Sequence, residues 1–322
     1  MKAIQIHRHG GPEVLAMGDV PVREPGDGEL RIRVHAAGVN FIDVYHRSGL
    51  YKNTLPFTPG VEGAGVVEAL GAGVDGFAVG DRVAWCMSPG GYAEHAIIPV
   101  RTTVKLPDAV SFDLGAAAML QGLTAHYLVK STFALRAGQV ALVHAAAGGV
   151  GLLLVQMAKA MGATVIGTTS TEAKAKLVSD AGADHVVRYT EADFVAETQR
   201  LIHGKGVDVV CDSVGATTFE GSMKCLHPRG MLVSFGQSSG AVEPISPLIL
   251  STHGSLYLTR PNLAHYMLDR AEVEWRSGEL FGMIAEGKLR VRVDTRFPLS
   301  EAADAHRALE SRKTAGKLIL IP

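Results

Sequence analysis

The stretch VHAAAGGVGLLLVQMAKAMGATVIGTTSTEAKAK, from Val143 to Lys176, decides the fold of this chain. The apolar run VALVHA leads into it, a glycine turn follows, and an apolar helical segment comes after the turn. A strand, a glycine turn and a helix in this order are the context that a dinucleotide-binding motif requires. The stretch therefore predicts the first strand–helix unit of a parallel, nucleotide-binding sheet.

The glycine turn departs from the usual G-x-G-x-x-G spacing, because Ala145 stands where the first glycine is expected. Gly148 lets backbone N–H groups approach a pyrophosphate, and the following helix N-terminus favours its negative charge. Gly151 removes a side chain where helix and strand must pack closely. We predict that the turn, with Gly149 and Val150, binds a dinucleotide; a packing turn without ligand is the alternative.

The end of the second strand, ATVIGTTST, indicates which dinucleotide is bound. NAD-binding folds place Asp or Glu here for the ribose 2′-hydroxyl, but this chain has Thr169 and Ser170. Hydroxyls leave room for a 2′-phosphate and donate to it, Lys174 adds positive charge, and Tyr189 adds a phenolic donor. These residues favour NADPH over NADH. Glu172 argues against this choice, and we expect its side chain to point to solvent.

The chain divides into three regions that differ in their pattern of apolar residues, glycines and prolines. Residues 1–123 read as short alternating strands between glycines and prolines, which is typical of an antiparallel β domain. In residues 124–260 six β-branched runs alternate with helical stretches, which predicts a doubly wound parallel α/β sheet. Residues 261–322 end in KLILIP, a strand without a partner nearby in sequence. We expect this strand to return to the first domain.

Composition narrows the classes of protein. The 322 residues suffice for two domains, and the formal net charge of -1 provides no general basic field for nucleic acid. No run of about 18 apolar residues predicts a membrane span, and the N-terminus reads as a strand rather than a signal peptide. Cys86, Cys211 and Cys225 form no CxxC pair, which favours a reducing cytoplasm.

Several motifs together resemble the quinone oxidoreductases of the medium-chain dehydrogenase/reductase superfamily, the relatives of zeta-crystallin. They are GVNFIDVYHRSGLY, TPGVEGAGVVEALGAGVDGFAVGDRV, GGYAEHAIIP, LQGLTAHYLV, HAAAGGVG and DSVG, and together they cover nearly the whole chain. The resemblance implies a GroES-like domain of residues 1–123 to which 261–322 return, and a Rossmann domain of residues 124–260. It also implies NADPH and a homodimer joined through the Rossmann domains. The last strand of that sheet, SLYLTR (Ser255–Arg260), is the expected dimer edge.

The zinc alcohol dehydrogenases of the same superfamily are the main alternative within it. They have GHE where this chain has GVE, so Val61 replaces the metal-binding His, and Asn40 replaces a Cys. Glu62 and Asp43 remain, but they cannot form the three-ligand N/S site of catalytic zinc. None of the 13 histidines has metal-ligand spacing. We therefore predict no metal, and a substrate that is already electrophilic, such as a quinone.

The resemblance also assigns the remaining site residues. The segment DVYHRSGLY is expected to line the substrate pocket, where Tyr45 and Tyr51 can stack on a flat ring and donate to its oxygen. Asn40 is expected to anchor the cofactor side. Further cofactor contacts are carried over by position: Gln121 and Thr124, which we expect to open a helix into the second domain, Ser213, Val214, Phe235, Gly236, Ser238 and Lys317.

Two other functions stay open. An NADPH-dependent enoyl or alkenal reductase could use the same tyrosines to protonate the α-carbon of an unsaturated carbonyl compound. A non-catalytic cofactor- or RNA-binding protein is the alternative of another class. The near-neutral charge and the lack of clusters of aromatic and basic residues argue against RNA. The expected partners are a small quinone and a second copy of the chain, without nucleic acid or membrane insertion.

Overall fold

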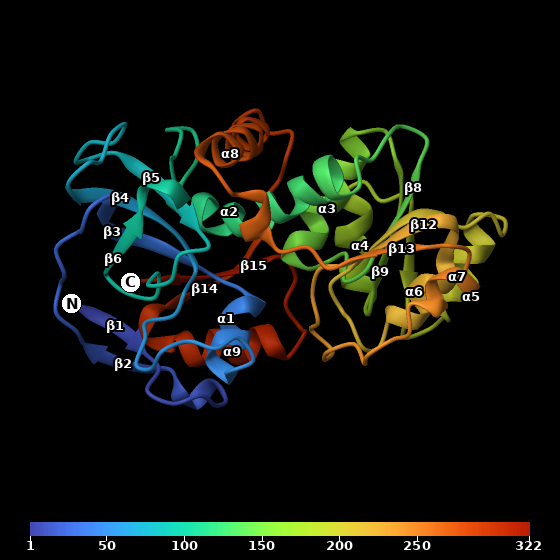
Figure 1. Cartoon of the computed structure of the whole chain (residues 1–322), viewed down its shortest axis with the longest axis horizontal. Helices are drawn as coiled ribbons and strands as arrows, with labels where there is room; N and C mark the ends of the chain where they lie inside the picture. The colour runs from blue at the N-terminus through green and yellow to red at the C-terminus, as the bar shows by residue number, and fades with distance from the viewer. The chain divides into compact units, whose positions relative to one another are not determined.

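The computed structural model describes all residues, 1–322. The chain forms two compact units (Figure 1). Unit 1 consists of Met1–Leu123 and Tyr266–Pro322, and unit 2 consists of Thr124–His265. The prediction placed its boundaries after residues 123 and 260, and the second unit of the structure extends to His265.

Unit 1 is built on a largely antiparallel sheet in the order β14-β15-β3-β4-β5-β7, with β6 pairing with β3. Its strands are β3 (Glu29–Val39), β4 (Glu62–Leu70), β5 (Arg82–Cys86), β6 (His95–Pro99), β7 (Thr103–Lys105), β14 (Val293–Pro298) and β15 (Lys317–Ile321). A separate hairpin pairs β1 (Lys2–Gln5) with β2 (Ala16–Asp19). The C-terminal β15, red in Figure 1, pairs antiparallel with the blue β3, so the two ends of unit 1 share one sheet.

The core of unit 1 follows the alternation along β3, where Leu30, Ile32 and Val34 are buried on one face. Helices lie around this sheet: α1 (Phe41–Ser48), α8 (Arg270–Ala285) and α9 (Ala302–Glu310). Four 3-10 turns complete the pair of units: η1 (Pro12–Val14), η2 (Val100–Thr102), η4 (Leu263–Tyr266) and η5 (Leu299–Glu301). Asn40 is the N-cap of α1, and Gly49, with φ +82°, is its C-cap. Of the two predicted catalytic tyrosines, Tyr45 lies within α1 and Tyr51 lies just beyond it.

Unit 2 is a parallel sheet in the order β10-β9-β8-β11-β12-β13. Its strands are β8 (Val140–Val143), β9 (Thr164–Thr169), β10 (His185–Arg188), β11 (Val207–Asp212), β12 (Leu226–Ser234) and β13 (Tyr257–Thr259). The order runs outward in both directions from β8, which is the arrangement of a doubly wound dinucleotide fold. The predicted fold class, a doubly wound parallel α/β sheet with a second, antiparallel β domain, is present in the structure.

Helices connect consecutive strands of unit 2: α3 (Gly149–Ala160), α4 (Glu172–Asp180), α5 (Phe194–Leu201), α6 (Phe219–Cys225) and α7 (Leu248–Thr252). Their starts follow local signals in the sequence. Thr171 caps α4 by accepting from the Lys174 N–H, and Asp193 caps α5 by accepting from Val195 and Ala196. Gly162, with φ +80°, follows the end of α3 and lets the chain turn into β9.

The helix α2 (Phe112–Tyr127) corrects one prediction. Gln121 and Thr124 do not open a helix, because they lie in the second half of α2, and the boundary between the units falls inside it. The run AAAMLQGLTA contains no proline, and its one glycine is not enough to end a helix. A π-helical turn, η3 (Leu128–Thr132), follows α2 directly. No helix in the structure combines the length and the apolar character needed to cross a bilayer.

Candidate functional site

The predicted dinucleotide residues of unit 2 gather at one edge of its sheet. Gly148–Gly151 follow β8, Thr169 ends β9 and Ser170 follows it, Ser213 and Val214 follow β11, and Phe235, Gly236 and Ser238 follow β12. Parallel strands end at the same edge, so all these residues lie along the carboxyl edge of the sheet. In this fold, ligands bind at that edge.

The glycine turn has the features of an anion site. Gly148 is the N-cap of α3, and no side chain caps this helix. Its first N–H groups can therefore meet a phosphate. A Cβ on Gly151 would lie 2.5 Å from the Ala145 carbonyl oxygen and 2.7 Å from the Ala146 Cα, so only glycine permits this contact between helix and turn. The turn fits a dinucleotide pyrophosphate.

The end of β9 carries hydroxyls rather than a carboxylate. Thr169 is buried, Ser170 is half-buried, and the Thr169 carbonyl accepts from the Tyr189 N–H at 3.1 Å. The Tyr189 side chain is exposed, and Lys174 lies half-buried in the first turn of α4. Glu172 points to solvent with 79% of its side chain exposed.

The loops after β11 and β12 are held against each other. The Asp212 carbonyl accepts from the Phe235 N–H at 2.8 Å, and the Ser213 carbonyl accepts from the Ser238 N–H at 3.2 Å. A Cβ on Gly236 would lie only 2.6 Å from the Ser213 carbonyl oxygen. The structure thus brings four of the predicted contacts, in two loops, into direct proximity within unit 2.

Unit 1 contains a buried ion pair. The Lys317 Nζ lies 2.5 Å from the Glu62 Oε2 and 2.6 Å from the Asn40 Oδ1, and Asn40 Nδ2 donates to the same Glu62 oxygen at 2.8 Å. All three side chains are buried. The other Glu62 oxygen accepts from the Leu120 N–H at 2.6 Å. A Cβ on Gly38 would lie 2.3 Å from Glu62 Oε2, so residue 38 has no room for a side chain.

This cluster does not suit a zinc ion. The Val61 side chain has no atom that can bind a metal, and the Asn40 amide hydrogen-bonds to Lys317 and Glu62. The Lys317 ammonium already neutralises Glu62, and a divalent cation there would face that positive charge. Across the chain, no group of three or more His, Cys, Asp or Glu residues is placed to hold a metal ion. Catalytic zinc needs three protein ligands of N, S or O type, and the residues present do not supply them.

Asp43, in the first turn of α1, is wholly buried and is surrounded by hydrogen-bond donors. Its Oδ2 accepts from the Asn40 N–H at 2.9 Å, its Oδ1 accepts from the Val61 N–H at 3.2 Å, and Tyr92 donates to it at 3.2 Å. Burial raises the pKa of Asp43 to about 7, although these donors and Lys317 act to lower it. Asp43 thereby joins the start of α1 to β4.

A chain of hydrogen bonds continues from Tyr92 to the other end of α1. The Tyr92 hydroxyl gives its single proton to Asp43, so it accepts from the His306 Nε2–H at 3.1 Å. The His306 Nδ1 then accepts from Arg47 at 3.0 Å, and Arg47 forms two further bonds with Glu310, at 2.8 and 2.9 Å. Burial and the Arg47 charge lower the pKa of His306 to about 3. The ring is therefore neutral.

The two predicted catalytic tyrosines lie close together on the outer side of α1. The Tyr45 and Tyr51 rings are 5.3 Å apart between centroids and meet edge-on at 65°. Tyr45 is half-buried, and Tyr51 is 37% exposed. Gly49 turns the chain between them, and the Tyr51 N–H donates to the Tyr45 carbonyl at 3.1 Å. A flat ligand could reach both rings.

Asn40 was predicted as a site residue, but Asp43, Tyr92, Arg47 and His306 of the buried hydrogen-bond chain were not. Asn40 and Asp43 stand three positions apart at the start of α1, which is a capping pattern that the sequence displays. Arg47 and His306 are 259 positions apart, and no local pattern connects them. The role of Lys317 toward a cofactor stays a prediction, and its contacts in unit 1 are with Asn40 and Glu62.

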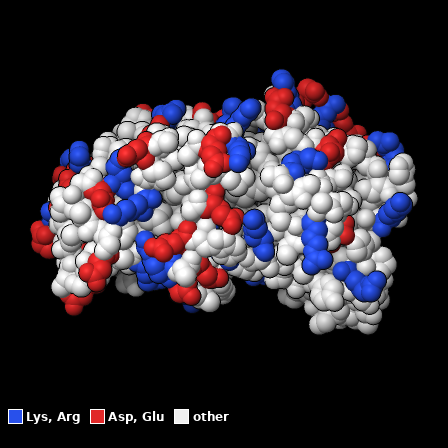
Figure 2. Space-filling view, turned by 90° about the horizontal axis from the view of Figure 1, so that it is seen from above, with Lys and Arg blue, Asp and Glu red and all other residues white.

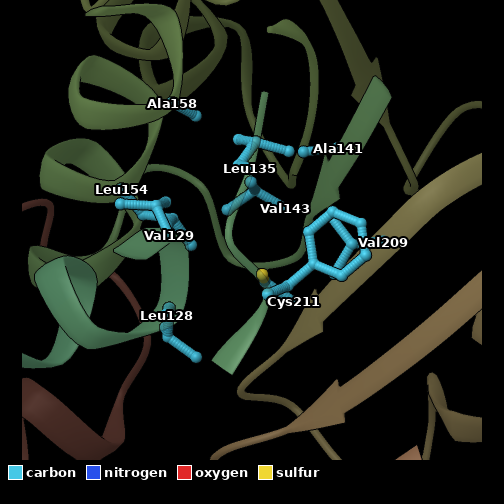
Figure 3. A pocket seen from close by; sticks show the side chains of 10 residues that line it. Leu128, Val129, Leu135, Ala141, Val143, Leu154, Ala158, Val209 and Cys211 are labelled. Carbon is cyan, nitrogen blue, oxygen red and sulfur yellow. The ribbon is translucent and has the colours of Figure 1, made fainter. Parts of the chain in front are cut away.

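The pocket in Figure 3 is not a ligand site. Leu154 and Ala158 of α3 face Ala141 and Val143 of β8 across it, and Cys211 lies at its lower end (Figure 3). The cavity measures about 10 Å³, which is the space of roughly one water molecule. Its lining is almost wholly apolar, so it is a packing gap between helix and sheet.

Figure 2 shows charges of both signs on one face of the molecule. Basic and acidic side chains are mixed over most of that face, and basic side chains predominate toward its lower right. Part of the surface charge of the chain is paired, as in Lys176 with Asp180 and Arg188 with Glu191.

Two family models match the chain. The alcohol dehydrogenase GroES-like domain matches residues 26–108, and the zinc-binding dehydrogenase model matches residues 149–269. The first lies in unit 1, and most of the second lies in unit 2. The second model carries zinc in its description, although the residues of this chain do not fit that metal.

Full-length relatives are also found. A quinone oxidoreductase of Pseudomonas aeruginosa is 47% identical over 100% of this chain and 99% of its own length. A 2-haloacrylate reductase of Burkholderia is 42% identical over 99% of this chain and 98% of its own length. Among solved structures, the Escherichia coli quinone oxidoreductase complexed with NADPH matches with a TM-score of 0.98 and 44% identity, covering 100% of both chains.

Proposed function

This chain belongs to the quinone oxidoreductases of the medium-chain dehydrogenase/reductase superfamily, and from that premise we propose that it transfers hydride from NADPH to a quinone. The observation that carries the proposal is the carboxyl edge of the unit 2 sheet. There an uncapped helix N-terminus stands beside a strand end with hydroxyls in place of the acidic residue. Relatives complexed with NADPH support the same cofactor.

The residues that hold the cofactor follow from this edge. Backbone N–H groups of Gly149, Val150 and Gly151 would bind the pyrophosphate, while Ser170 and Lys174 would bind the 2′-phosphate. NADPH, when bound, supplies a hydride from its nicotinamide ring. The further predicted contacts are Asn40, Gln121, Thr124, Thr169, Tyr189, Ser213, Val214, Phe235, Gly236, Ser238 and Lys317.

The polar cluster of unit 1 supports a substrate that needs no metal. Lys317, Glu62 and Asn40 hydrogen-bond to one another, so their polar atoms are not available as zinc ligands. A quinone is electrophilic without a Lewis acid, since reduction makes its ring aromatic. We propose that the enzyme is zinc-independent and that Tyr45 and Tyr51 bind the flat quinone ring. A tyrosine hydroxyl there would donate to the oxygen on which negative charge develops.

A second function is favoured by one observation, the resemblance to a 2-haloacrylate reductase. Haloacrylates are α,β-unsaturated carboxylates, so this relative points to reduction of a carbon–carbon double bond. The same tyrosines could then protonate the α-carbon. The alternative of a non-catalytic RNA-binding protein has less support, because the formal net charge of -1 provides no general basic field for nucleic acid.

A direct assay separates these functions. The purified protein is mixed with NADPH and, in parallel, with p-benzoquinone or 2-chloroacrylate, each with and without EDTA. We expect quinone-dependent NADPH oxidation that EDTA leaves unchanged, and slower oxidation of NADH. Reduction of 2-chloroacrylate without any quinone turnover would establish the second function. Activity lost with EDTA and restored by zinc would contradict the zinc-independent mechanism.

Location and assembly belong to the same proposal. Cys86, Cys211 and Cys225 are all buried and unpaired, which suits a reducing cytoplasm. We also propose a homodimer that forms through β13, the edge strand of the unit 2 sheet.

A further inference from the structure

His144 is the last residue before the glycine turn, and its side chain is buried inside unit 2. Its Nδ1 lies 2.9 Å from the Thr168 Oγ1 of β9, and its Nε2 lies 3.0 Å from the Ser222 Oγ of α6. The ring also meets the Phe194 ring edge-on, with centroids 4.9 Å apart. With 2% of its surface exposed, His144 cannot touch a ligand, so its effect must pass through its neighbours.

Asp212, at the end of β11, fixes the direction of these hydrogen bonds. Its carboxylate accepts from the N–H groups of Val214 and Gly215, at 2.7 and 3.1 Å, and from the Thr218 hydroxyl at 2.7 Å. It also lies 3.1 Å from the Ser222 Oγ. An ionised carboxylate can only accept hydrogen bonds, so Ser222 donates its one hydroxyl proton to Asp212.

The direction of the other hydrogen bonds follows from that first bond. Ser222 can only accept from His144, so the ring proton of His144 is on Nε2. The ring is neutral, because burial lowers the pKa of His144 against the opposing charge of Asp212. Its Nδ1 therefore accepts, and the donor is the Thr168 hydroxyl. The protons all run one way, from Thr168 through His144 and Ser222 to Asp212.

These hydrogen bonds, from Thr168 to Asp212, connect the ends of three neighbouring strands at the edge where the cofactor is proposed to bind. The strands are adjacent in the order β9-β8-β11. Thr168 directly precedes Thr169 and Ser170, and Asp212 holds the backbone of the loop that begins at Ser213. The backbone supports the same arrangement, since Ala146 N–H donates to the Thr168 carbonyl at 3.0 Å.

We propose that His144 is a positioning residue for the dinucleotide site. Through Thr168 and Asp212 it fixes the loops after β8, β9 and β11 relative to one another. It also holds the Thr168 hydroxyl in a hydrogen bond that points into the protein, away from the ligand. The 2′-phosphate is then received by Thr169, Ser170 and Lys174 alone. This inference rests on the proposed function, because it assigns a role toward NADPH.

Two substitutions of His144 test the proposal. His144→Phe keeps a ring against Phe194 but removes both polar atoms, whereas His144→Gln keeps one acceptor and one donor in a side chain of similar reach. Val207→Ala is the matched control, because Val207 is buried at the opposite end of β11 and contacts no cofactor loop. NADPH dissociation constants and thermal midpoints are measured for all four proteins.

We expect His144→Phe to weaken NADPH binding about tenfold, which corresponds to about 1.4 kcal/mol. His144→Gln should restore the affinity to within about threefold. Val207→Ala should lower the thermal midpoint and leave the NADPH affinity unchanged. Wild-type affinity in His144→Phe, or a loss in Val207→Ala equal to that in His144→Phe, would overturn the proposal in favour of a purely structural role.

The tautomer is a separate readout that requires no nucleotide. In protein labelled with ¹⁵N-histidine, the His144 resonances are assigned by their absence from His144→Gln. We expect the pattern of a neutral ring protonated at Nε2. A ring protonated at Nδ1, or a doubly protonated ring, would contradict the direction of the chain. Failure of the wild type to bind NADPH would instead contradict the proposed function, and the tautomer would still test the hydrogen-bond chain.

Discussion

Thr169 at the end of β9 and Ser170 just after it are the residues that we propose to select the cofactor. Thr169 and Ser170 provide no negative charge, and Glu172, the nearest carboxylate along the chain, shares the Arg188 guanidinium with Glu191, at 3.0 and 2.6 Å. Arg188 stands beside Thr169 in the register of β10 with β9. Exposed ion pairs stabilise little, but this one places a positive charge next to the carboxylate that would otherwise repel a phosphate. Lys174 then remains the cation nearest to Ser170 along the chain.

Replacing Lys174 by alanine should remove most of the preference for NADPH. A charge-assisted contact contributes about 1.5–3 kcal/mol, so NADPH affinity should fall by roughly 10- to 150-fold while NADH affinity stays the same. Fluorescence titration with both nucleotides measures this. Lys176→Ala is the matched control, because Lys176 lies on the same helix and pairs with Asp180. Equal losses of NADPH affinity in both variants would show that α4 contributes only general charge.

The sequence identifies residues of this kind when they share one motif. The glycines and hydroxyls lie within the stretch from Val143 to Lys176, where each position follows from strand, turn and helix. The partners of Lys317 could not be found in this way, because Glu62 is 255 positions away and Asn40 is 277. Such pairs depend on how distant strands are arranged, and only the folded sheet brings β15 to β3.

At the scale of the element, α1 is held at both ends by the chain from Arg47 to Asp43. The helix has only eight residues, which is too short to be stable in isolation. His306 of α9 and Tyr92 close the chain between its two ends. The orientation of α1, and with it the two tyrosine rings, therefore depends on a neutral His306.

Acid should weaken unit 1 through His306. Its pKa is about 3 in the folded protein against 6.5 for an unperturbed histidine, so between these values the unfolded chain binds more protons. Stability is therefore lost as the pH falls through about 6.5 toward 3, by up to about 1.4 kcal/mol per pH unit. Asp43, raised to about 7, acts in the opposite sense between about 4 and 7. His306→Gln should remove the histidine contribution alone.

Thermal midpoints measured from pH 7.5 to pH 5 check this expectation. Because Asp43 acts in the opposite sense over part of this range, the test is the difference between the two proteins: as the pH falls, the midpoint of His306→Gln should rise relative to that of the wild type. His7→Gln serves as the control, since His7 is exposed in unit 1, and its curve should follow the wild type. Parallel curves for all three proteins would mean that His306 does not govern the acid response.

Elements were easier to predict than their ends. The six strands of unit 2 were predicted from β-branched runs between helical stretches, and their parallel pairing is present. The helix α2 was misjudged, because its alanine-rich sequence continues past the position where the domain texture changes. Nothing local marks a boundary inside a helix, since the same backbone hydrogen bonds run on either side of it.

At the scale of the whole molecule, the sheet of unit 2 has an unpaired side along β13. This strand is short, and Tyr257 at its start is 59% exposed. Leu248, in the helix that precedes the strand, is 67% exposed. An exposed strand edge with apolar side chains invites pairing with another strand. A second copy related by a two-fold axis would pair β13 with β13 and continue the sheet.

If the proposed homodimer forms through β13, Tyr257→Glu should dissociate it. Pairing of β13 with β13 would bury residue 257 of both copies in the new interface, so two glutamate carboxylates would lose their water there in place of two tyrosines. Light scattering after size-exclusion chromatography should give about twice the 34.0 kDa chain mass for the wild type and the single chain mass for the variant. Val79→Glu, which places the same charge at an exposed valine of unit 1, should remain dimeric. A monomeric wild type, or a variant that stays dimeric, would exclude β13 as the dimer edge, because an interface there cannot accommodate two buried negative charges.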